Sequence, residues 1–235
     1  TARACGGLGA VPSEGLGGLG GGMKVSAFIV DYQTQAQAES LSIDLAGSRL
    51  AEGTELEIFH VDNSSPDPVE LSEAQRRLGI RLIRNPGNRG YAGGFADALA
   101  QIGSLKSDFY LLLNSDLRVE PDAVARLLKL MEDFPRAGVG GGRIFAVDSE
   151  GGKKPWGTRG VVYPAIGMTR MTDWPERGIL PRWSYVPGAM MILRREALDE
   201  VGGFDLRYRM YFEETDLCVR MQMRGWGLAI DPGSV

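Results

Sequence analysis

An apolar run that ends abruptly in polar side chains constrains the fold of this chain more than any other feature. Residues 109–116 read Phe-Tyr-Leu-Leu-Leu-Asn-Ser-Asp, so an apolar stretch runs directly into Asn114 and Asp116. A strand that is apolar on both faces is typical of a sheet covered by helices on both sides. In open α/β sheets, ligands bind beyond the carboxyl ends of such strands. The run therefore predicts an α/β fold with Asp116 at the functional edge of its sheet.

The order of the upstream elements indicates a mostly parallel sheet. Strands are expected over residues 24–30, 56–61 and 80–84, and helices over 35–50, 70–78 and 91–102. Alternating strands and helices form parallel sheets with right-handed crossovers. A helix opening at Pro121 and ending at Met131 should follow the 109–113 strand. A short strand over 189–193 and helices over 195–201 and 213–224 are expected near the end of the chain.

Residues 151–187 are rich in Gly, Pro, Trp and Met and show little periodicity. We expect an irregular segment with short strands there, because long connections in compact domains tend to carry function.

Composition removes several classes of function. The single histidine, His60, lies within an expected strand and is interpreted as a core or edge side chain, which disfavours His-rich zinc sites and His-dependent nucleophiles. A net charge of −4 without a basic stripe argues against nucleic acid as a partner. No stretch approaches the length of a membrane span. Cys5 and Cys218 lack CxxC partners and give no support for a disulfide, which favours a cytoplasmic location.

Two acidic stations are candidates for catalysis. Asp116 is placed to hold Mg²⁺ or Mn²⁺ against a diphosphate leaving group, although Asn114 and Asp116 would equally suit a turn that caps the next helix. Glu213 and Glu214 open an expected helix, where carboxylates interact favourably with the helix dipole whatever their function. A general base there would have to face the same cleft as Asp116.

Two polar loops are candidates for binding a nucleoside. Asp62 and Asn63 follow one strand, and the run from Asn88 to Gly94 follows the next. A carboxylate accepts the N3 proton of uracil or thymine, and glycines let a ribose approach the backbone closely. The alternative is a pair of ordinary loops with Asx turns. The glycine spacing is not the GxGxxG fingerprint, so a dinucleotide site is disfavoured.

Six blocks taken together carry a resemblance to a known family. They are Phe-Ile-Val-Asp-Tyr (28–32), Val-Asp-Asn-Ser-Ser (61–65), Asn-Pro-Gly-Asn-Arg-Gly-Tyr-Ala-Gly-Gly (85–94), Leu-Leu-Asn-Ser-Asp (112–116), Gly-Ala-Met-Met-Ile-Leu-Arg-Arg (188–195), and Val-Gly-Gly-Phe-Asp (201–205) followed by Tyr-Phe-Glu-Glu-Thr-Asp-Leu-Cys-Val-Arg (211–220) and Gly-Trp (225–226). In this order they resemble glycosyltransferase family 2, and most nearly its rhamnosyltransferase-like branch of bacterial polysaccharide biosynthesis.

The resemblance implies a GT-A fold with a Rossmann-like central sheet, a nucleotide-sugar donor, a divalent metal (Mg²⁺ or Mn²⁺) and inversion at the anomeric carbon. Asp116 would be the metal ligand, and Glu214, with Glu213 beside it, the base. The donor would be bound by Tyr32, Asp62, Asn63, Asn88, Gly90, Gly93, Gly94, Asn114 and Ser115. The floor under donor and acceptor would comprise Trp183, Gly188, Ala189 and Asp205. Relatives carry an Asp where this chain has Asn114, and another where it has Glu214.

The resemblance also divides the chain. Residues 1–22 are expected to be a disordered Gly-rich extension that is not native, with Met23 as the natural start. Residues 23–235 would be a single domain with a nucleotide-binding half (23–117) and an acceptor-binding half (118–235). The turn signal at residues 231–235 and the length of related proteins suggest a chain truncated at its C-terminus.

The leading hypothesis is an inverting transferase that moves a sugar, rhamnose being one candidate, from a dTDP- or UDP-sugar to a hydroxyl of a lipid-linked or polysaccharide acceptor. The alternative is an inactive or truncated module that binds a nucleotide-sugar. A sugar nucleotidylyltransferase is disfavoured, because its phosphate loop should follow the first strand and residues 31–34 do not fit it. A polyprenyl-diphosphate-linked acceptor would require peripheral contact with the inner face of the bacterial cell membrane, yet no amphipathic basic helix stands out.

Overall fold

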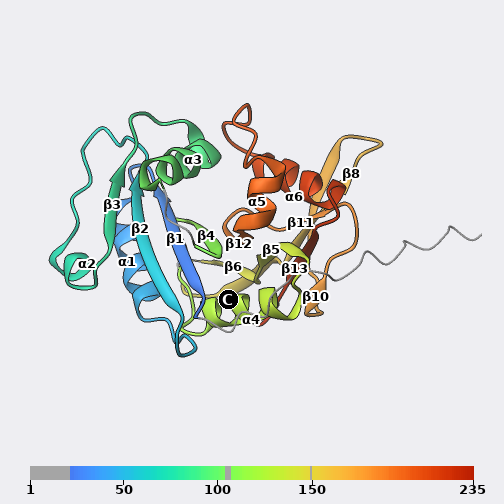
Figure 1. Cartoon of the computed structure of the whole chain (residues 1–235), viewed down its shortest axis with the longest axis horizontal. Helices are drawn as coiled ribbons and strands as arrows, with labels where there is room; N and C mark the ends of the chain where they lie inside the picture. The colour runs from blue at the N-terminus through green and yellow to red at the C-terminus, as the bar shows by residue number, and fades with distance from the viewer. Residues whose placement is uncertain (1–21, 104–106, 149) are drawn as a thin grey trace, which may run out of the picture.

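One eight-stranded sheet forms the centre of the computed structural model, which describes residues 22–103, 107–148 and 150–235 (Figure 1). Its strands are β1 (Lys24–Asp31), β2 (Glu55–Asp62), β3 (Arg81–Arg84), β4 (Phe109–Asn114), β5 (Ala137–Gly141), β10 (Gly178–Ile179), β12 (Met190–Arg194) and β13 (Gly227–Ile230). The expected extension over residues 1–22 lies, except for Gly22, outside the described residues, and so does Cys5. Cys218 is buried and free.

The sheet is mostly parallel, in the order β10-β13-β5-β12-β4-β1-β2-β3. β1 pairs in parallel with β2 and β4, β2 with β3, and β5 with β13. β12 runs antiparallel between β4 and β5, and β10 antiparallel to β13. The predicted α/β class and mostly parallel sheet are therefore confirmed, with an antiparallel strand next to β4.

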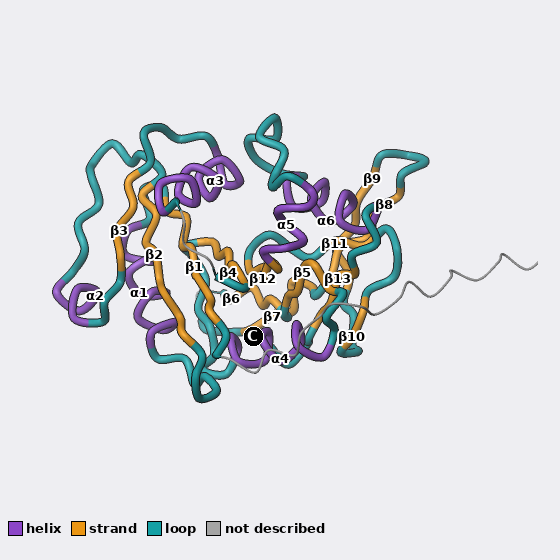
Figure 2. The backbone as a smooth tube through the Cα atoms, viewed as in Figure 1, coloured by secondary structure: helices purple, strands orange, loops and turns teal. Residues whose placement is uncertain are grey.

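Helices cover both faces of the sheet (Figure 2). They are α1 (Gln35–Ala46), α2 (Glu73–Arg77), α3 (Gly90–Ile102), α4 (Ala123–Asp133), α5 (Arg195–Val201) and α6 (Glu213–Met223). Side chains alternate along β1: Val25, Ala27 and Ile29 pack with α1 and α4, whereas Phe28 and Val30 pack with α3, α5 and α6. β1 and β4 are buried over almost their whole length because each of their faces meets a helical layer.

Most expected elements are present, but α1 and α2 are shorter than expected and α4 begins and ends later than expected. α1 ends at Ala46, not at residue 50, and α2 begins at Glu73, where Ser72 and Gln75 form a capping box. Pro121 does not open α4, which starts at Ala123 after a turn. Gly225 follows α6 with a φ of 85°, as expected of a glycine just beyond a helix end.

β5 and β13 are strands that the sequence analysis did not identify. β5 reads Ala-Gly-Val-Gly-Gly, a poor strand sequence. Its glycines are required by close packing: a Cβ on Gly140 would lie 2.7 Å from Ile192 Cγ2, and one on Gly138 would lie 2.8 Å from Met221 Sδ. The core therefore selects small residues here, at the expense of strand propensity.

The segment over residues 151–187 contains more strand than expected. β7 (Lys153–Gly157) pairs with β6 (Ile144–Val147), and β8 (Arg159–Tyr163) forms a hairpin with β9 (Met168–Thr172). β11 (Ser184–Tyr185) joins the other side of β8. Within the described ranges, none of the helices is long and apolar enough to cross a membrane.

Candidate active site

Four loops meet at the carboxyl edge of the sheet. β3, β2, β1 and β4 are parallel neighbours in that order, so their carboxyl ends lie on the same side. Tyr32 directly follows β1, Asp62 ends β2, Asn88 lies beyond β3, and Asp116 lies beyond β4. The predicted nucleotide-binding residues and the predicted metal ligand therefore share one edge, where ligands bind in open α/β sheets.

Asp62 is buried, and its carboxylate is held in place by protein groups. Its Oδ1 accepts the N–H of Ser65 at 2.8 Å, and its Oδ2 forms an ion pair with Arg84. Tyr32, in contrast, is exposed beside it. Asp62 and Arg84 face each other in the register of β2 and β3, so their pairing follows from the topology and not from any local motif. The Asp62 carboxylate is therefore fixed in orientation and has a cation beside it.

Three asparagines fasten the loops after β2 and β3 to α3. Asn63 donates to the Gly90 carbonyl at 3.0 Å and to Asn88 Oδ1 at 3.3 Å, while Asn85 donates to Asn63 Oδ1 at 3.1 Å and to the Gly94 carbonyl at 2.9 Å. A Cβ on Gly94 would lie 2.9 Å from Val30 Cγ1. The hydrogen bonds of these asparagines and the close packing of the buried glycines Gly93 and Gly94 therefore hold the two loops in place against α3.

A second network joins the loops after β1 and β4. Thr34 Oγ1 lies 2.7 Å from Ser115 Oγ, and the Thr34 N–H donates to Asp31 Oδ1 at 2.7 Å. Asp31 Oδ2 is 2.9 Å from His60 Nε2, and both side chains are fully buried, so the expectation of a core histidine is confirmed. Burial would raise the pKa of the Asp31 carboxyl, but hydrogen bonds from His60 and Thr34 outweigh it and lower that pKa.

Gly188 and Ala189 lie beside the two acidic sites, which are Asp116 after β4 and the pair Glu213 and Glu214 at the start of α6. The Asn114 N–H donates to the Ala189 carbonyl at 2.9 Å, which ties the end of β4 to this peptide. On the other side, a Cβ on Gly188 would lie 3.4 Å from Glu214 Cβ. The end of β4 at Asn114 and the Glu214 side chain therefore both lie beside the Gly188–Ala189 peptide.

Tyr91, in the first turn of α3, also contacts the Gly188–Ala189 peptide, and the sequence analysis did not identify it as a site residue. Its hydroxyl donates to the Gly188 carbonyl at 2.9 Å. Burial raises the pKa of the phenol well above its usual value, and nearby carboxylates raise it further: those of Glu213, Glu214 and Asp116. The charges of these three carboxylates therefore all act on the Tyr91 hydroxyl.

Glu213 and Glu214 begin α6 after an unusual backbone turn. Tyr211 and Phe212 both have positive φ, 67° and 70°. Such values are uncommon for residues other than glycine and cluster at functional sites. Burial raises the pKa of both Glu213 and Glu214, and the charge of Glu213 adds to the rise at Glu214. Each group is therefore a stronger base than an exposed carboxylate.

Glu213 is the more enclosed of the two, and its Oε2 has no hydrogen-bond partner among the described residues. Replacing it by glutamine should raise the free energy of unfolding at pH 7 by about 1 kcal/mol, because a buried unpaired charge is removed. Below the usual pKa of 4.5 the wild-type carboxyl is protonated in both folded and unfolded states, so the difference should close as pH falls.

Urea unfolding at pH 7 and pH 4 would measure this difference. Asp216→Asn is the matched control, since Asp216 pairs with Arg220 at 2.6 Å and its loss should destabilise the fold. If Glu213→Gln is less stable than wild type at pH 7, the buried charge of Glu213 does not destabilise the fold, and this interpretation is wrong.

The other two residues that were predicted to lie under donor and acceptor, Trp183 and Asp205, lie near opposite ends of α6. Trp183 is partly exposed, and its backbone N–H donates to Gln222 Oε1 at 3.2 Å. Asp205 forms an ion pair with Arg207, whose hydrogen bonds lower the pKa of Asp205 to about 2. Trp183 thus lies by the C-terminal end of α6, while Asp205 belongs to the loop that leads into its N-terminal end.

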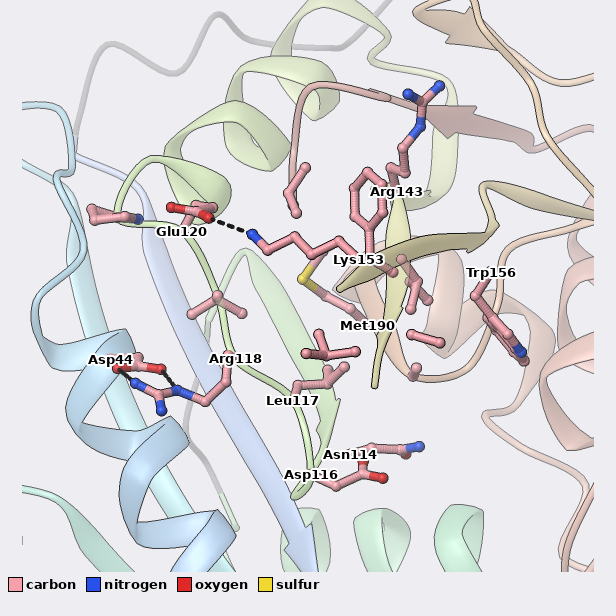
Figure 3. Close-up of a pocket in the computed structure, with 18 residues that line it drawn as sticks. Asp44, Asn114, Asp116, Leu117, Arg118, Glu120, Arg143, Lys153, Trp156 and Met190 are labelled. Carbon is pink, nitrogen blue, oxygen red and sulfur yellow. Dashed lines mark hydrogen bonds and ion pairs between the residues drawn. The ribbon is translucent and has the colours of Figure 1, made fainter. Parts of the chain in front are cut away.

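A cleft of about 870 Å³ begins at Asn114, Asp116 and Ala189 and extends towards β6 and β7 (Figure 3). Its lining includes three cations, each already paired: Arg118 with Asp44, Arg143 with Asp173 and Lys153 with Glu120. Neither Glu213 nor Glu214 lines it. The expectation that the base would face the same cleft as Asp116 is therefore not met by this cavity, and Glu214 is linked to the end of β4 through the Gly188–Ala189 peptide instead.

Asp116 is exposed and Asn114 is half-buried next to it. Within the described part of the chain, no group of three or more His, Cys, Asp or Glu side chains is placed to hold a metal. Mg²⁺ is commonly bound through one or two carboxylates together with substrate phosphates. One carboxylate and an adjacent amide oxygen fit a metal that is shared with a diphosphate, and do not fit a closed protein site.

Solved structures of glycosyltransferases share this fold. A mannosyltransferase from Pyrobaculum calidifontis, in complex with GDP-Man and Mn²⁺, aligns with a TM-score of 0.64 over 96% of this chain and 59% of its own, at 15% identity. TarS of S. aureus in complex with UDP-GlcNAc aligns with a TM-score of 0.64 over 90% of this chain and 56% of its own, also at 15% identity. The fold is therefore GT-A.

Curated proteins give the sequence relationship. The N-acetylglucosaminyl-diphospho-decaprenol L-rhamnosyltransferase of Mycobacterium tuberculosis is 27% identical over 206 residues, which cover 77% of this chain and 66% of the relative. The low-salt glycan biosynthesis hexosyltransferase Agl10 of Haloferax volcanii is 23% identical over 83% of this chain and 61% of its own length. The chain thus spans less than two thirds of either relative. The family model described as "Glycosyl transferase family 2" matches residues 43–202, and the chain belongs to this family.

Proposed function

We propose that the chain transfers a sugar from a nucleotide-sugar donor to a hydroxyl group of a lipid-linked or polysaccharide acceptor, with inversion at the anomeric carbon. The proposal is supported by the Gly188–Ala189 peptide, which lies beside both acidic sites: Asn114, two residues before Asp116, donates to the Ala189 carbonyl, and Glu214 lies next to Gly188. In a single displacement the diphosphate leaves from one face of the anomeric carbon and the hydroxyl attacks the opposite face, so the two groups need residues on opposite sides of that carbon.

The loops at the carboxyl edge would bind the nucleoside diphosphate. Asp62, oriented by Ser65 and Arg84, would accept the N3 proton of a uracil or thymine base, and exposed Tyr32 would cover the base. The start of α3, which the asparagine network holds in place, would lie beside the ribose. A UDP- or dTDP-sugar fits these groups.

Asp116, with Asn114 beside it, would hold Mg²⁺ or Mn²⁺ together with the two phosphates of the donor. The metal would supply positive charge against the diphosphate as it leaves. Support for a metal comes from the Mn²⁺ bound in the structurally similar mannosyltransferase.

Glu214 would act as the general base. The acceptor oxygen would form a bond to the anomeric carbon while the bond from that carbon to the diphosphate oxygen breaks, and the hydroxyl proton would pass to the Glu214 carboxylate. A single displacement of this kind inverts the anomeric configuration. The glycine at position 188 keeps the space next to Glu214 open, since any side chain there would contact the glutamate.

The name of one relative indicates which donor and which acceptor to test first. The Mycobacterium tuberculosis relative is named as a rhamnosyltransferase for a decaprenol-linked N-acetylglucosaminyl diphosphate. We therefore infer rhamnose as the first sugar to test, and a polyprenyl-diphosphate-linked glycan as the first acceptor, reached from the inner face of the cell membrane.

A thermal-shift screen of dTDP-, UDP- and GDP-sugars with and without Mn²⁺ tests the proposal, followed by mass spectrometry of products. A donor at a hundred times its dissociation constant should add about 2.7 kcal/mol of stability, a rise of about 5 to 10 °C in melting temperature. The rise should require Mn²⁺ for its full size. No shift with any donor and no transferred sugar would contradict the proposal.

The second candidate is a module that binds a nucleotide-sugar without turnover. It is favoured by one observation: the cleft that Asp116 lines does not include Glu213 or Glu214. The same screen separates the two functions, because the module would give the Mn²⁺-dependent shift with no product from any acceptor.

A further inference from the structure

Large apolar side chains project from two places on the acceptor side of the molecule. The aromatic loop, residues 206–212 between α5 and α6, exposes Leu206, Tyr208, Met210, Tyr211 and Phe212. Met210 is 63% and Tyr211 73% exposed. The tip of the β8–β9 hairpin, residues 163–168, exposes Tyr163, Ile166 and Met168, with Ile166 at 67%. Apolar side chains exposed in groups mark interaction surfaces, whereas single ones need no explanation.

The aromatic loop is exposed at a conformational cost. Its last two residues, Tyr211 and Phe212, adopt the left-handed region, which costs roughly 1–2 kcal/mol for each residue that carries a Cβ. Burial in the core does not compensate, because both side chains lie largely in solvent. A strained turn that presents aromatic rings to solvent is best explained by something that the rings bind.

Both places lie on the side of the molecule that carries the candidate active site. The loop packs against the start of α3, where a Cβ on Gly90 would overlap the Arg209 carbonyl, and it leads directly into Glu213. Figure 1 shows the loop and the turn of the hairpin projecting from the same upper margin as α3. Whatever these side chains contact must lie near the mouth of the site.

The charge around these side chains is positive. Residues 206–212 contain Arg207 and Arg209, and residues 159–172 contain Arg159 and Arg170; neither stretch contains Asp or Glu. Arg207 pairs with Asp205, but the exposed Arg170 and Arg209 form no ion pair within the described residues. Asp205 and the acidic residues that begin α6 flank the first stretch, so the positive charge of these two places comes from the exposed Arg170 and Arg209.

We propose that the aromatic loop and the tip of the β8–β9 hairpin dock on a membrane surface that contains anionic lipids. Tyrosine and phenylalanine side chains favour the boundary between headgroups and acyl chains, and arginines favour anionic headgroups. Docking in this way turns the carboxyl edge of the sheet towards the bilayer. The inference goes beyond sugar transfer and can be tested without it, because docking requires no donor.

Co-sedimentation of the full chain with phosphatidylglycerol–phosphatidylcholine vesicles tests the inference, with phosphatidylcholine vesicles for comparison. The wild type should bind the anionic vesicles at least tenfold more tightly. Tyr211→Ser with Phe212→Ser should weaken binding at least tenfold, and Ile166→Ser with Met168→Ser should do the same. Arg170→Gln with Arg209→Gln should weaken it about thirtyfold, or roughly fivefold per arginine.

Leu78→Ser with Leu82→Ser is the matched control, because both leucines are exposed at the far side of the sheet by α2 and β3 and should not affect binding. Melting temperatures show whether each variant folds. Absence of wild-type binding, or equal loss in the control, would overturn the inference. So would loop variants that bind vesicles normally but fail to transfer sugar to a water-soluble acceptor, because the loop would then contact the acceptor and not the bilayer.

Discussion

Replacing Glu214 by glutamine is expected to lower kcat for sugar transfer by about 10²–10⁴-fold, the usual contribution of a general base. The change keeps the size of the side chain and its contact with Gly188, so the dissociation constant of the donor should stay within a few-fold of wild type. Initial rates of product formation and calorimetry of donor binding measure the two quantities. Glu196→Gln, an exposed glutamate in the first turn of α5, is the control and should leave both unchanged.

The pH dependence of kcat/KM provides an independent check on the base. Burial and the charge of Glu213 raise the pKa of Glu214, and a base works only when it is deprotonated. The rate should therefore fall as pH decreases through this raised pKa. Glu213→Gln removes one of the two causes, so it should move the acid limb to lower pH. Loss of activity in Glu213→Gln with full activity in Glu214→Gln would reverse the assignment of the base.

Replacing Asp116 by alanine is expected to remove the Mn²⁺ dependence of donor binding and to lower kcat/KM by about a hundredfold or more. The reason is that a metal bound at a diphosphate supplies several kcal/mol of charge stabilisation in the transition state. Calorimetry of donor binding at several Mn²⁺ concentrations, together with initial rates, measures the effect.

Asp122→Ala is the control for Asp116→Ala. It removes a carboxylate six residues further along, from the N-cap of α4, where its side chain makes no capping hydrogen bond. It should leave the metal dependence intact. Unchanged Mn²⁺ dependence in Asp116→Ala would show that the metal, if one is used, is held elsewhere.

β1 and β4 of the nucleotide-binding half could be predicted because most of their residues are apolar. Burial on both faces leaves that signature in β1 and β4. β5 left none, because its place between β12 and β13 requires glycines that meet Ile192 and Met221. A strand whose sequence is dictated by its neighbours can be recognised only when those neighbours are known.

The candidate site divides in the same way. Asp62, Asn88 and Asp116 could be selected because polar residues directly after strands occupy the functional edge of a parallel sheet. Tyr91 and Arg84 could not, because their roles depend on contacts with Gly188 and Asp62, which are far away in sequence. The aromatic loop was equally hidden, since a run of apolar residues reads the same whether it is buried or exposed.

The central claim is that Asp116 and Glu214 serve the same reaction: Asp116 holds the metal at the leaving diphosphate, and Glu214 takes the proton of the attacking hydroxyl. A crystal structure of the chain with a dTDP- or UDP-sugar and Mn²⁺ tests it most directly. We predict the metal bound to Asp116 and the donor diphosphate, with the anomeric carbon facing the Glu214 carboxylate across Gly188. A donor lying in the cleft between Lys153 and Trp156, with Glu214 out of reach of its sugar, would contradict the account.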